Sequence, residues 1–194
     1  MHSLRYLTPA IPARAERSAP SATGIRKGLA ALRGLGLGLL LVGATAGALA
    51  AGQPVSVTER VALAAAPART WQTISDFEGW QAWHPAFAGT VITKGHGNDA
   101  GTVRVLTAKD GAVFTEELVA YDATARTYRY RILQSPLPID GYVSTLEVRG
   151  DAGGSSVVWS SSFEVRDGAS EADVKKAIAA VYRSGLDNLG ALLK

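Results

Sequence analysis

Cysteine is absent from the 194-residue sequence, and histidine and methionine are rare, with three copies and one copy. Without cysteine the chain can form no disulfide bond, no thiolate nucleophile and no cysteine-ligated metal site. The sequence also lacks an H-E-x-x-H motif, a histidine cluster and a glycine-rich phosphate loop, so we expect no metal ion and no cofactor. The serine run at 160–162 has no G-x-S-x-G elbow of the kind found in serine hydrolases.

Basic residues are concentrated at the N-terminus. Residues 1–33 contain six Lys and Arg residues against one Glu, a net charge of +5, whereas residues 52–194 contain 14 basic and 16 acidic residues, a net charge of −2. Binding to a nucleic-acid backbone depends on clustered basic side chains. We therefore expect no nucleic-acid partner.

Residues 34–58 carry no charged side chain. A basic segment, an apolar run over residues 35–51 and the triplet at 48–50 (Ala-Leu-Ala) are typical of a secretory signal cleaved near Ala50. The run approaches the length of about 20 residues that a spanning helix needs, so an inner-membrane anchor over residues 34–51 is the alternative, with membrane contact through that segment. Either way, we expect residues 1–51 to be a leader of an exported, periplasmic or secreted protein.

Residues 52–194 are expected to form one domain. In the absence of disulfides its stability must come from the hydrophobic core, and a domain of about 140 residues can bury enough surface for this.

Aromatic side chains gather within residues 71–89, where three of the four tryptophans lie. The pattern predicts a helix over residues 67–75, which begins with a proline, and a second short helix that Asp76 caps and that ends by Pro85. Two helices this short cannot bury so much aromatic surface against each other. They require a concave partner, which a curved sheet could supply.

Apolar alternation with a period of two predicts seven strands. They cover residues 55–63, 89–94, 102–108, 112–121, 126–133, 141–149 and 156–165. A long helix follows, with Ser170 and Asp173 as an S-x-x-D start and an apolar stripe that continues to Leu193. We expect an α+β helix-grip fold, in which a curved antiparallel sheet, two short helices and a long C-terminal helix surround an apolar cavity.

Several short motifs accompany this order of elements. They are Trp71 with Ile74–Phe77, Trp80-x-x-Trp83-His84-Pro85, Gly101–Arg104, Glu116–Leu118, Ala120–Asp122, Tyr128-x-Tyr130, Trp159-x-x-x-Phe163 and Tyr182–Leu186. In these residues the chain resembles the START-like superfamily (SRPBCC), which includes birch-pollen-allergen-type proteins, plant abscisic-acid receptors and the bacterial polyketide cyclase/dehydrase group. The resemblance covers about residues 55–193 and implies the helix-grip fold. It implies less about activity, because carriers, receptors, cyclases and hydrolases share this fold.

The strand pattern also predicts which side chains face the cavity. If Asp110 and Gly111 form a two-residue hairpin loop, Arg104 lies opposite Glu117, and the two form an ion pair on the outer face of the sheet. The inner face of this hairpin would then carry Val103, Val105, Thr107, Phe114, Glu116, Leu118 and Ala120.

On the later strands the same alternation places tyrosines, serines and large apolar residues inward. These residues are Tyr128, Tyr130, Ile132, Tyr142, Ser144, Leu146, Val148, Val157, Trp159, Ser161 and Phe163. A mostly apolar wall with a few hydroxyl groups is typical of a site for a small organic ligand, although tyrosines can equally fill a core. The residues expected to bind the ligand are Trp83, His84, Phe114, Glu116, Tyr130, Tyr142, Ser144, Trp159, Phe163, Ile178, Tyr182 and Leu186.

Few titratable residues are candidates for catalysis. An inward Glu116 needs a partner, a proton or water, because burying an unpaired carboxylate is costly, and Glu59 interrupts the first strand in the same way. His84 could move protons on a carbonyl ligand near neutral pH. A structural role is the more frequent one for a histidine beside a proline, as capping is for Asp76. Glu116 and His84 are therefore the catalytic candidates.

Two functions are compatible with these features. The first is binding or carriage of a small hydrophobic molecule, such as a lipid, an acyl chain or a polyketide-like compound. The second is a cyclase or lyase reaction on a polyketide-like carbonyl compound. The lack of a convincing catalytic pair favours the carrier. A third possibility is an interaction module whose interior is filled by its own side chains.

We expect the ligand to enter between the C-terminal helix and the neighbouring loops, with the segment 135–138 (Ser-Pro-Leu-Pro) as a lip. Gly185 would leave room beside the cavity. On this hypothesis Gly185→Leu abolishes ligand uptake and leaves the fold intact.

Overall fold

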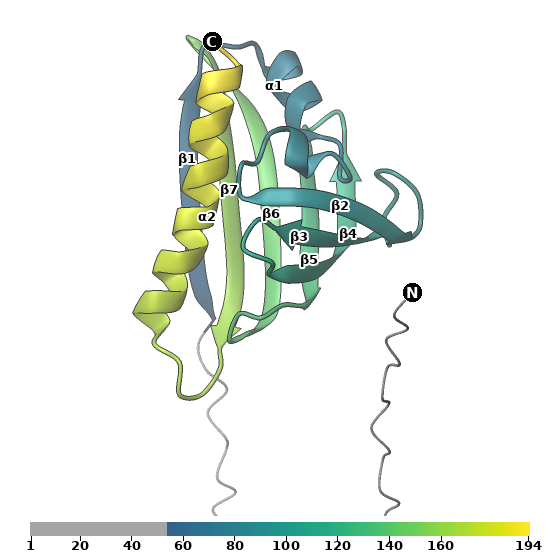
Figure 1. Ribbon diagram of the computed structural model, residues 1–194. Coiled ribbons are helices and arrows are strands. Elements are labelled where there is room, and N and C mark those ends of the chain that lie inside the picture. Colours follow the sequence, from purple (N-terminus) through teal and green to yellow (C-terminus); the bar gives the residue numbers. More distant parts are fainter. Residues whose placement is uncertain (1–53) are drawn as a thin grey trace, which may run out of the picture. The chain divides into compact units, whose positions relative to one another are not determined.

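A computed structural model describes residues 54–194 (Figure 1). The strands are β1 (Val55–Leu63), β2 (Phe87–Lys94), β3 (Val103–Ala108), β4 (Val113–Asp122), β5 (Thr127–Gln134), β6 (Ile139–Asp151) and β7 (Gly154–Val165). The helices are α1 (Pro67–Ile74), the 3-10 helix η1 (Trp80–Ala82) and α2 (Glu171–Leu192). The expected leader, residues 1–51, lies outside the described residues. Within residues 54–194 no helix is both long and apolar enough to cross a membrane.

The seven strands form one antiparallel sheet in the order β1-β7-β6-β5-β4-β3-β2. Strands β2 to β7 each lie beside their neighbours in sequence, as short turns favour. Helix α2 runs along β1 and β7, while α1 and η1 follow β1 and lead into β2 (Figure 1). This is the predicted α+β helix-grip fold. The second short helix is only a single 3-10 turn.

The segment between β1 and β2 buries its aromatic residues as expected. Helix α1 has Pro67 in its first turn and buries Trp71 and Ile74. The expectation that Asp76 caps the second helix is wrong. Its carboxylate accepts a hydrogen bond from the Glu78 amide (3.0 Å) and thereby shapes the turn before η1, whose N-cap residue is Gly79 and whose N-terminus receives no side-chain cap hydrogen bond.

Helix α2 begins as its sequence predicts, with the Ser170 hydroxyl accepting from the Asp173 amide (3.3 Å). Gly185 has a different role from the one expected. A Cβ atom at this position would lie 2.5 Å from Cδ2 of His84 and 3.0 Å from Cζ3 of Trp83. The space beside Gly185 is therefore filled by His84, and the hypothesis that Gly185 leaves room for a ligand is wrong.

The turn between β3 and β4 comprises residues 109–111, one residue more than the sequence suggested. The Ala108 amide donates to the Ala112 carbonyl (2.8 Å), and Gly111 has a φ of +90°. A three-residue loop that ends in a left-handed glycine is a common hairpin connection. The extra residue shifts the pairing of the two strands by one position, so that Arg104 faces Glu116.

This shift reverses the faces of β3, because side chains alternate along a strand. Arg104 and Leu106 are buried, whereas the predicted inner residues Val103, Val105 and Thr107 lie on the other face. The predicted Arg104–Glu117 ion pair is therefore wrong. Glu117 instead pairs on the outer face with Arg131 of β5 (2.7 Å). Ala120 of β4 is also exposed, since a bulge after Leu118 interrupts the alternation.

The alternation predicted for the later strands is confirmed. Tyr128, Tyr130, Ser144, Leu146 and Trp159 are all at most 1% exposed, and Tyr142, Val148, Val157, Ser161 and Phe163 are buried as well. Together with the aromatic residues around η1 they form one continuous core.

Candidate functional site

A cavity of about 520 Å³ lies between the inner face of the sheet and α2. It is bordered by the β3–β4 turn, the loop between β5 and β6, and one face of α2. Its lining residues are Trp80, Ala86, Phe87, Ala108, Lys109, Asp110, Ala112, Phe114, Glu116, Tyr130, Ile132, Pro136, Leu137, Tyr142, Trp159, Ala177, Ile178, Val181 and Tyr182. The cavity is predominantly apolar. Its volume argues against a domain filled by its own side chains.

Seven of the twelve expected ligand-binding residues line this cavity. They are Phe114, Glu116, Tyr130, Tyr142, Trp159, Ile178 and Tyr182. Pro136 and Leu137 line it as well, which places the expected lip beside the cavity.

The other five expected residues are buried but do not line the cavity. They are Trp83, His84, Ser144, Phe163 and Leu186. Ser144 lies behind the cavity wall, where its hydroxyl bonds to the hydroxyl of Tyr182 (3.3 Å). The sequence did not identify Trp80 and Phe87 as lining residues. In a segment with only one turn of 3-10 helix, no periodicity distinguishes Trp80 from Trp83.

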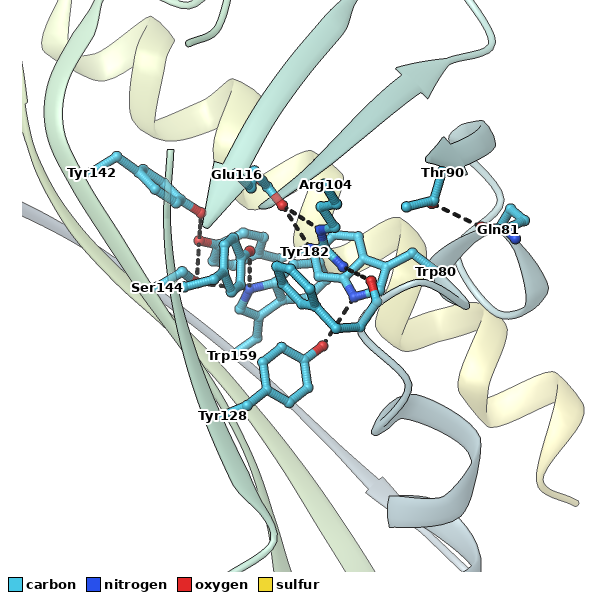
Figure 2. A network of polar contacts seen from close by, with 12 residues as sticks. Trp80, Gln81, Thr90, Arg104, Glu116, Tyr128, Tyr142, Ser144, Trp159 and Tyr182 are labelled. Carbon is cyan, nitrogen blue, oxygen red and sulfur yellow. Dashed lines mark hydrogen bonds and ion pairs between the residues drawn. The ribbon is translucent and has the colours of Figure 1, made fainter. Parts of the chain in front are cut away.

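The most polar feature of the interior is an ion pair between Arg104 and Glu116. Nε and Nη2 of Arg104 donate to Oε2 of Glu116 at 2.8 and 2.6 Å, and Nη1 donates to the Phe77 carbonyl (Figure 2). The guanidinium carbon lies 3.9 Å from the ring centre of Phe77 and 3.8 Å from that of Trp80. The side chain of Arg104 is 0% exposed. Hydrogen bonds and aromatic faces thus replace the water that this charge loses.

The sequence required a partner, a proton or water for an inward carboxylate at Glu116, and the structure shows that the partner is Arg104. Burial raises the pKa of the Glu116 carboxyl above its usual range, and the charge and hydrogen bonds of Arg104 counteract this shift. Both hydrogen bonds from Arg104 end on Oε2. Within residues 54–194, Oε1 receives no hydrogen bond, and Glu116 lines the cavity.

A second polar group consists of hydroxyls behind and within the cavity wall. Tyr142 and Tyr182 are hydrogen-bonded through their hydroxyls, and Ser144 bonds to Tyr182 (Figure 2). The Ser144 hydroxyl also donates to the Ser160 carbonyl (2.8 Å). The indole nitrogen of Trp159 donates to Ser144 (3.0 Å) and Tyr130 (3.2 Å). Burial raises the pKa of all three tyrosines well above the ordinary value, so these hydroxyls stay protonated at neutral pH.

His84 has a structural position. Its Nε2 bonds to the Val181 carbonyl (3.0 Å), its Nδ1 accepts from the Ala86 amide (3.2 Å), and the side chain does not line the cavity. Burial lowers the pKa of His84 from 6.5 to about 4. Protonation of Nδ1 would also set a second donor against the Ala86 amide. The imidazole therefore fastens the segment after η1 to α2 in its neutral form.

Glu59, the second inward carboxylate considered from the sequence, has no place in the cavity. It pairs with Arg183 on α2, and its side chain is 17% exposed. This ion pair links β1 to α2 at the surface. No group of three or more metal-ligating side chains occurs within residues 54–194.

Comparison with known proteins places this architecture in a family. The family model described as "Polyketide cyclase / dehydrase and lipid transport" matches residues 54–194. A search of curated proteins gave no match.

Solved structures share the fold over nearly their whole length. XoxI from Bacillus cereus is 28% identical with a TM-score of 0.62, and the match covers 74% of this chain and 95% of XoxI. A protein from Nitrosospira multiformis is 27% identical with a TM-score of 0.64, covering 72% of this chain and 97% of that one. Ara h 8.0201 is 20% identical with a TM-score of 0.62, covers 73% and 98%, and shows likeness of fold alone. The chain belongs to the polyketide cyclase/dehydrase and lipid transport family of the SRPBCC superfamily.

Proposed function

We propose that this protein binds and carries a small, neutral, hydrophobic molecule in the cavity between the sheet and α2. The observation that carries this proposal is a cavity of about 520 Å³ with a mainly apolar wall and a few hydroxyl groups. Pockets of this size and composition suit organic ligands that bury most of their surface. Membership of a family described by cyclase, dehydrase and lipid-transport activities is consistent with it.

A cyclase or dehydrase is the second candidate, and Glu116 is the observation that favours it, since it lines the cavity and its Oε1 receives no hydrogen bond from residues 54–194. General acid–base catalysis would need a second group with a suitable pKa near the same atom of the substrate. His84 does not line the cavity and holds its neutral form at physiological pH. The tyrosines that do line it titrate far above neutral pH. Carriage therefore accounts for the site better than catalysis.

Ligand entry is proposed to occur between α2 and the two neighbouring loops. Ala177 and Val181 of α2 line the cavity, and so do Pro136 and Leu137 of the β5–β6 loop. Ala177, Pro136 and Val181 are also exposed to solvent, so this part of the wall meets the surface. A bulky side chain here would obstruct the opening without disturbing the core.

Ala177→Trp should therefore reduce binding of a hydrophobic probe by tenfold or more, with little change in the free energy of unfolding. Ala180→Trp is the matched control, because Ala180 is exposed on the same helix and does not line the cavity. Equal binding by both variants would contradict this entry route.

Export is part of the proposal, supported by the charge pattern and apolar run of residues 1–51. The full chain should appear in the periplasm or medium with its N-terminus near residue 51 if the signal is cleaved, or in the inner-membrane fraction at full mass if it is an anchor. Cell fractionation followed by intact-mass measurement distinguishes the two. Recovery of the full-length chain in the cytoplasm would contradict both.

The first experiment is native mass spectrometry of the mature domain purified from its own host, followed by organic extraction. A stoichiometric hydrophobic molecule released unchanged would support carriage. A bound molecule that the protein converts on incubation would support the cyclase. Absence of any bound molecule, together with failure to bind added hydrophobic probes, would contradict both.

A further inference from the structure

The entrance of the cavity has two sides that belong to different parts of the fold. Val181 of α2 and Lys109 of the β3–β4 turn both line the cavity and are both exposed to solvent. Helix α2 packs along β1 and β7, whereas the turn joins two strands near the other edge of the sheet. The width of the entrance therefore depends on what connects α2 to the turn.

A series of three hydrogen bonds makes this connection, and His84 is at its centre. Nε2 of His84 bonds to the Val181 carbonyl (3.0 Å), and Nδ1 accepts from the Ala86 amide (3.2 Å). The Ala86 carbonyl in turn accepts from the Lys109 amide (2.8 Å). Both ends of the series are thus residues of the entrance, and Ala86 between them also lines the cavity.

This series fixes the protonation of the imidazole ring. A carbonyl only accepts, so Nε2 must carry the proton, and Nδ1 must be unprotonated to accept from the Ala86 amide. The ring of His84 is 0% exposed and lies against the rings of Trp80, Phe87 and Trp159. Neither bond can therefore be exchanged for one to bulk water unless the segment moves.

The same segment has a second attachment to α2 that does not involve the cavity. Nδ2 of Asn188 donates to the Trp83 carbonyl (2.8 Å), and neither residue lines the cavity. Asn188 lies about two turns beyond Val181 along α2. This bond can hold the segment on the helix while the bonds of His84 are broken, so the entrance can open without unfolding of the domain.

We propose that His84 is a positioning residue that holds the entrance closed, and that a ligand enters or leaves the cavity when the bonds through His84 break. This inference rests on the proposed carrier function and adds the residue that controls exchange. Weakening the series destabilises the closed form with and without ligand alike, so it raises the rates of association and dissociation together and changes the dissociation constant little. Damage to the packing of the cavity would instead raise the dissociation constant.

Two variants that each remove one hydrogen bond between the segment and α2 test this role. His84→Asn loses the reach to Val181, while its side-chain oxygen can still accept from the Ala86 amide two residues further on. Asn188→Ala is the matched control, because it removes the bond to the Trp83 carbonyl outside the cavity. Stopped-flow fluorescence with N-phenyl-1-naphthylamine, a neutral hydrophobic probe, measures both rates in protein expressed from the full-length gene.

We expect His84→Asn to accelerate association and dissociation about fivefold each, the factor that corresponds to one net hydrogen bond, with a dissociation constant within about threefold of the native value. Asn188→Ala should leave both rates within about twofold. Unchanged rates in His84→Asn, equal acceleration in both variants, or a raised dissociation constant with unchanged association would overturn the role of His84 and leave the carrier function standing. Failure of the native protein to bind the probe would contradict the carrier function and this inference with it.

Acidification of the native protein tests the same role without a substitution. Protonation converts Nδ1 of His84 from an acceptor into a second donor facing the Ala86 amide, which breaks the series on the side of the turn. Of the charged groups in residues 54–194, only Arg104 of β3 acts on the ring, and its charge opposes protonation. Helix α2 presents the Val181 carbonyl and Gly185 to the ring, and the neighbours from η1, β2 and β7 are aromatic.

The pH dependence has a defined sign. Burial lowers the pKa of His84 from 6.5 to about 4, so the closed form has its full stability above pH 6.5 and loses it as the pH falls toward 4. Between pH 7.5 and pH 5 we expect dissociation of the probe to accelerate about tenfold to thirtyfold in the native protein. His84→Gln, which has no titrating ring, should show no such acceleration. A native rate that stays constant over this range, or the same acceleration in His84→Gln, would overturn the proposal.

Discussion

The interior contains two polar clusters, and each provides partners for buried polar groups in a different way. The charged cluster centres on Arg104 and Glu116, whose ions are held by each other, by a carbonyl and by aromatic faces. The neutral cluster is the hydroxyl chain from Tyr142 through Tyr182 to Ser144, which ends on a backbone carbonyl. Removing the partner of a neutral buried hydroxyl lowers the free energy of unfolding only modestly, whereas removing the counterion of a buried ion lowers it much more. The two clusters should therefore respond very differently to truncation.

The largest effect is expected from removing one ion. Arg104→Met leaves Glu116 without its partner and should lower the free energy of unfolding by about 3–5 kcal/mol, measured by urea denaturation. The double variant Arg104→Met with Glu116→Leu removes both charges and should recover most of this loss. If Arg104→Met alone were as stable as the native protein, the charged cluster would be no more sensitive to truncation than the neutral one.

Acidification tests the same idea at His84, because it places a positive charge on a buried side chain that is neutral at physiological pH. The folded-state pKa of His84 is lowered to about 4 from 6.5, so its contribution to stability is present above pH 6.5 and is lost as the pH falls toward 4. Between pH 7.5 and pH 5 the loss should be about 2 kcal/mol.

His84→Gln, whose amide can still donate to the Val181 carbonyl, serves as the control for this measurement. It should remove that part of the pH dependence and leave the contributions of Glu116 and the surface carboxylates. Identical pH profiles of the two proteins would show that His84 does not titrate in this range.

Overpacking beside His84 tests whether the neutral form depends on close contact with α2. Gly185→Ala places a methyl group 2.5 Å from the His84 ring and should destabilise the domain by about 1–3 kcal/mol. Gly190→Ala is the control, because the new atom would meet only a Leu63 methyl group at 4.0 Å. Equal melting temperatures of the two variants would show that the His84 ring can move aside without a loss of stability.

The smallest effect is expected in the neutral cluster. Tyr142→Phe removes one hydroxyl of the chain and keeps the ring that stacks on Phe163, so it should cost about 1 kcal/mol or less. Urea denaturation under the conditions used for Arg104→Met gives the direct comparison. A loss as large as that of the arginine variant would mean that the hydroxyl chain acts as one cooperative unit.

The sequence predicted most of the fold because its signals are long. Each of the seven strands was located within two residues at either end, and the inner faces of β5, β6 and β7 were assigned correctly from several alternating pairs. The S-x-x-D motif at Ser170 also acts as predicted. In these strands an error of one position would turn several apolar side chains toward solvent at once, so the sequence pattern excludes it.

The β3–β4 hairpin was misassigned because its register depends on one residue in a turn. Asp110-Gly111 fits both a two-residue and a three-residue loop, and the two choices bury opposite faces of β3. Composition favoured the wrong face, since Val103 and Val105 are more apolar than Arg104. Burial of Arg104 is possible only because Phe77 and Trp80 cover its guanidinium, and these residues are distant in sequence.

The candidate site was predicted in its strand and helix residues and missed where the chain is irregular. Tyr130, Tyr142 and Trp159 follow from alternation, and Tyr182 was placed beside the cavity together with Leu186. Trp80 was overlooked in favour of Trp83, and His84 was assigned to the cavity although its ring faces Gly185. Such positions depend on tertiary packing rather than on any local pattern.

The placement of the tryptophans has a spectroscopic consequence. Trp80 and Trp159 form part of the cavity wall, their rings are 5.2 Å apart in an edge-to-face arrangement, and Trp159 stacks on Tyr182 at 4.1 Å. Indole emission depends on the mobility and polarity of its surroundings, so replacing solvent in the cavity with an organic molecule should shift the emission maximum and the near-ultraviolet dichroism of this coupled pair. The protein thus contains a label-free optical reporter of its own occupancy.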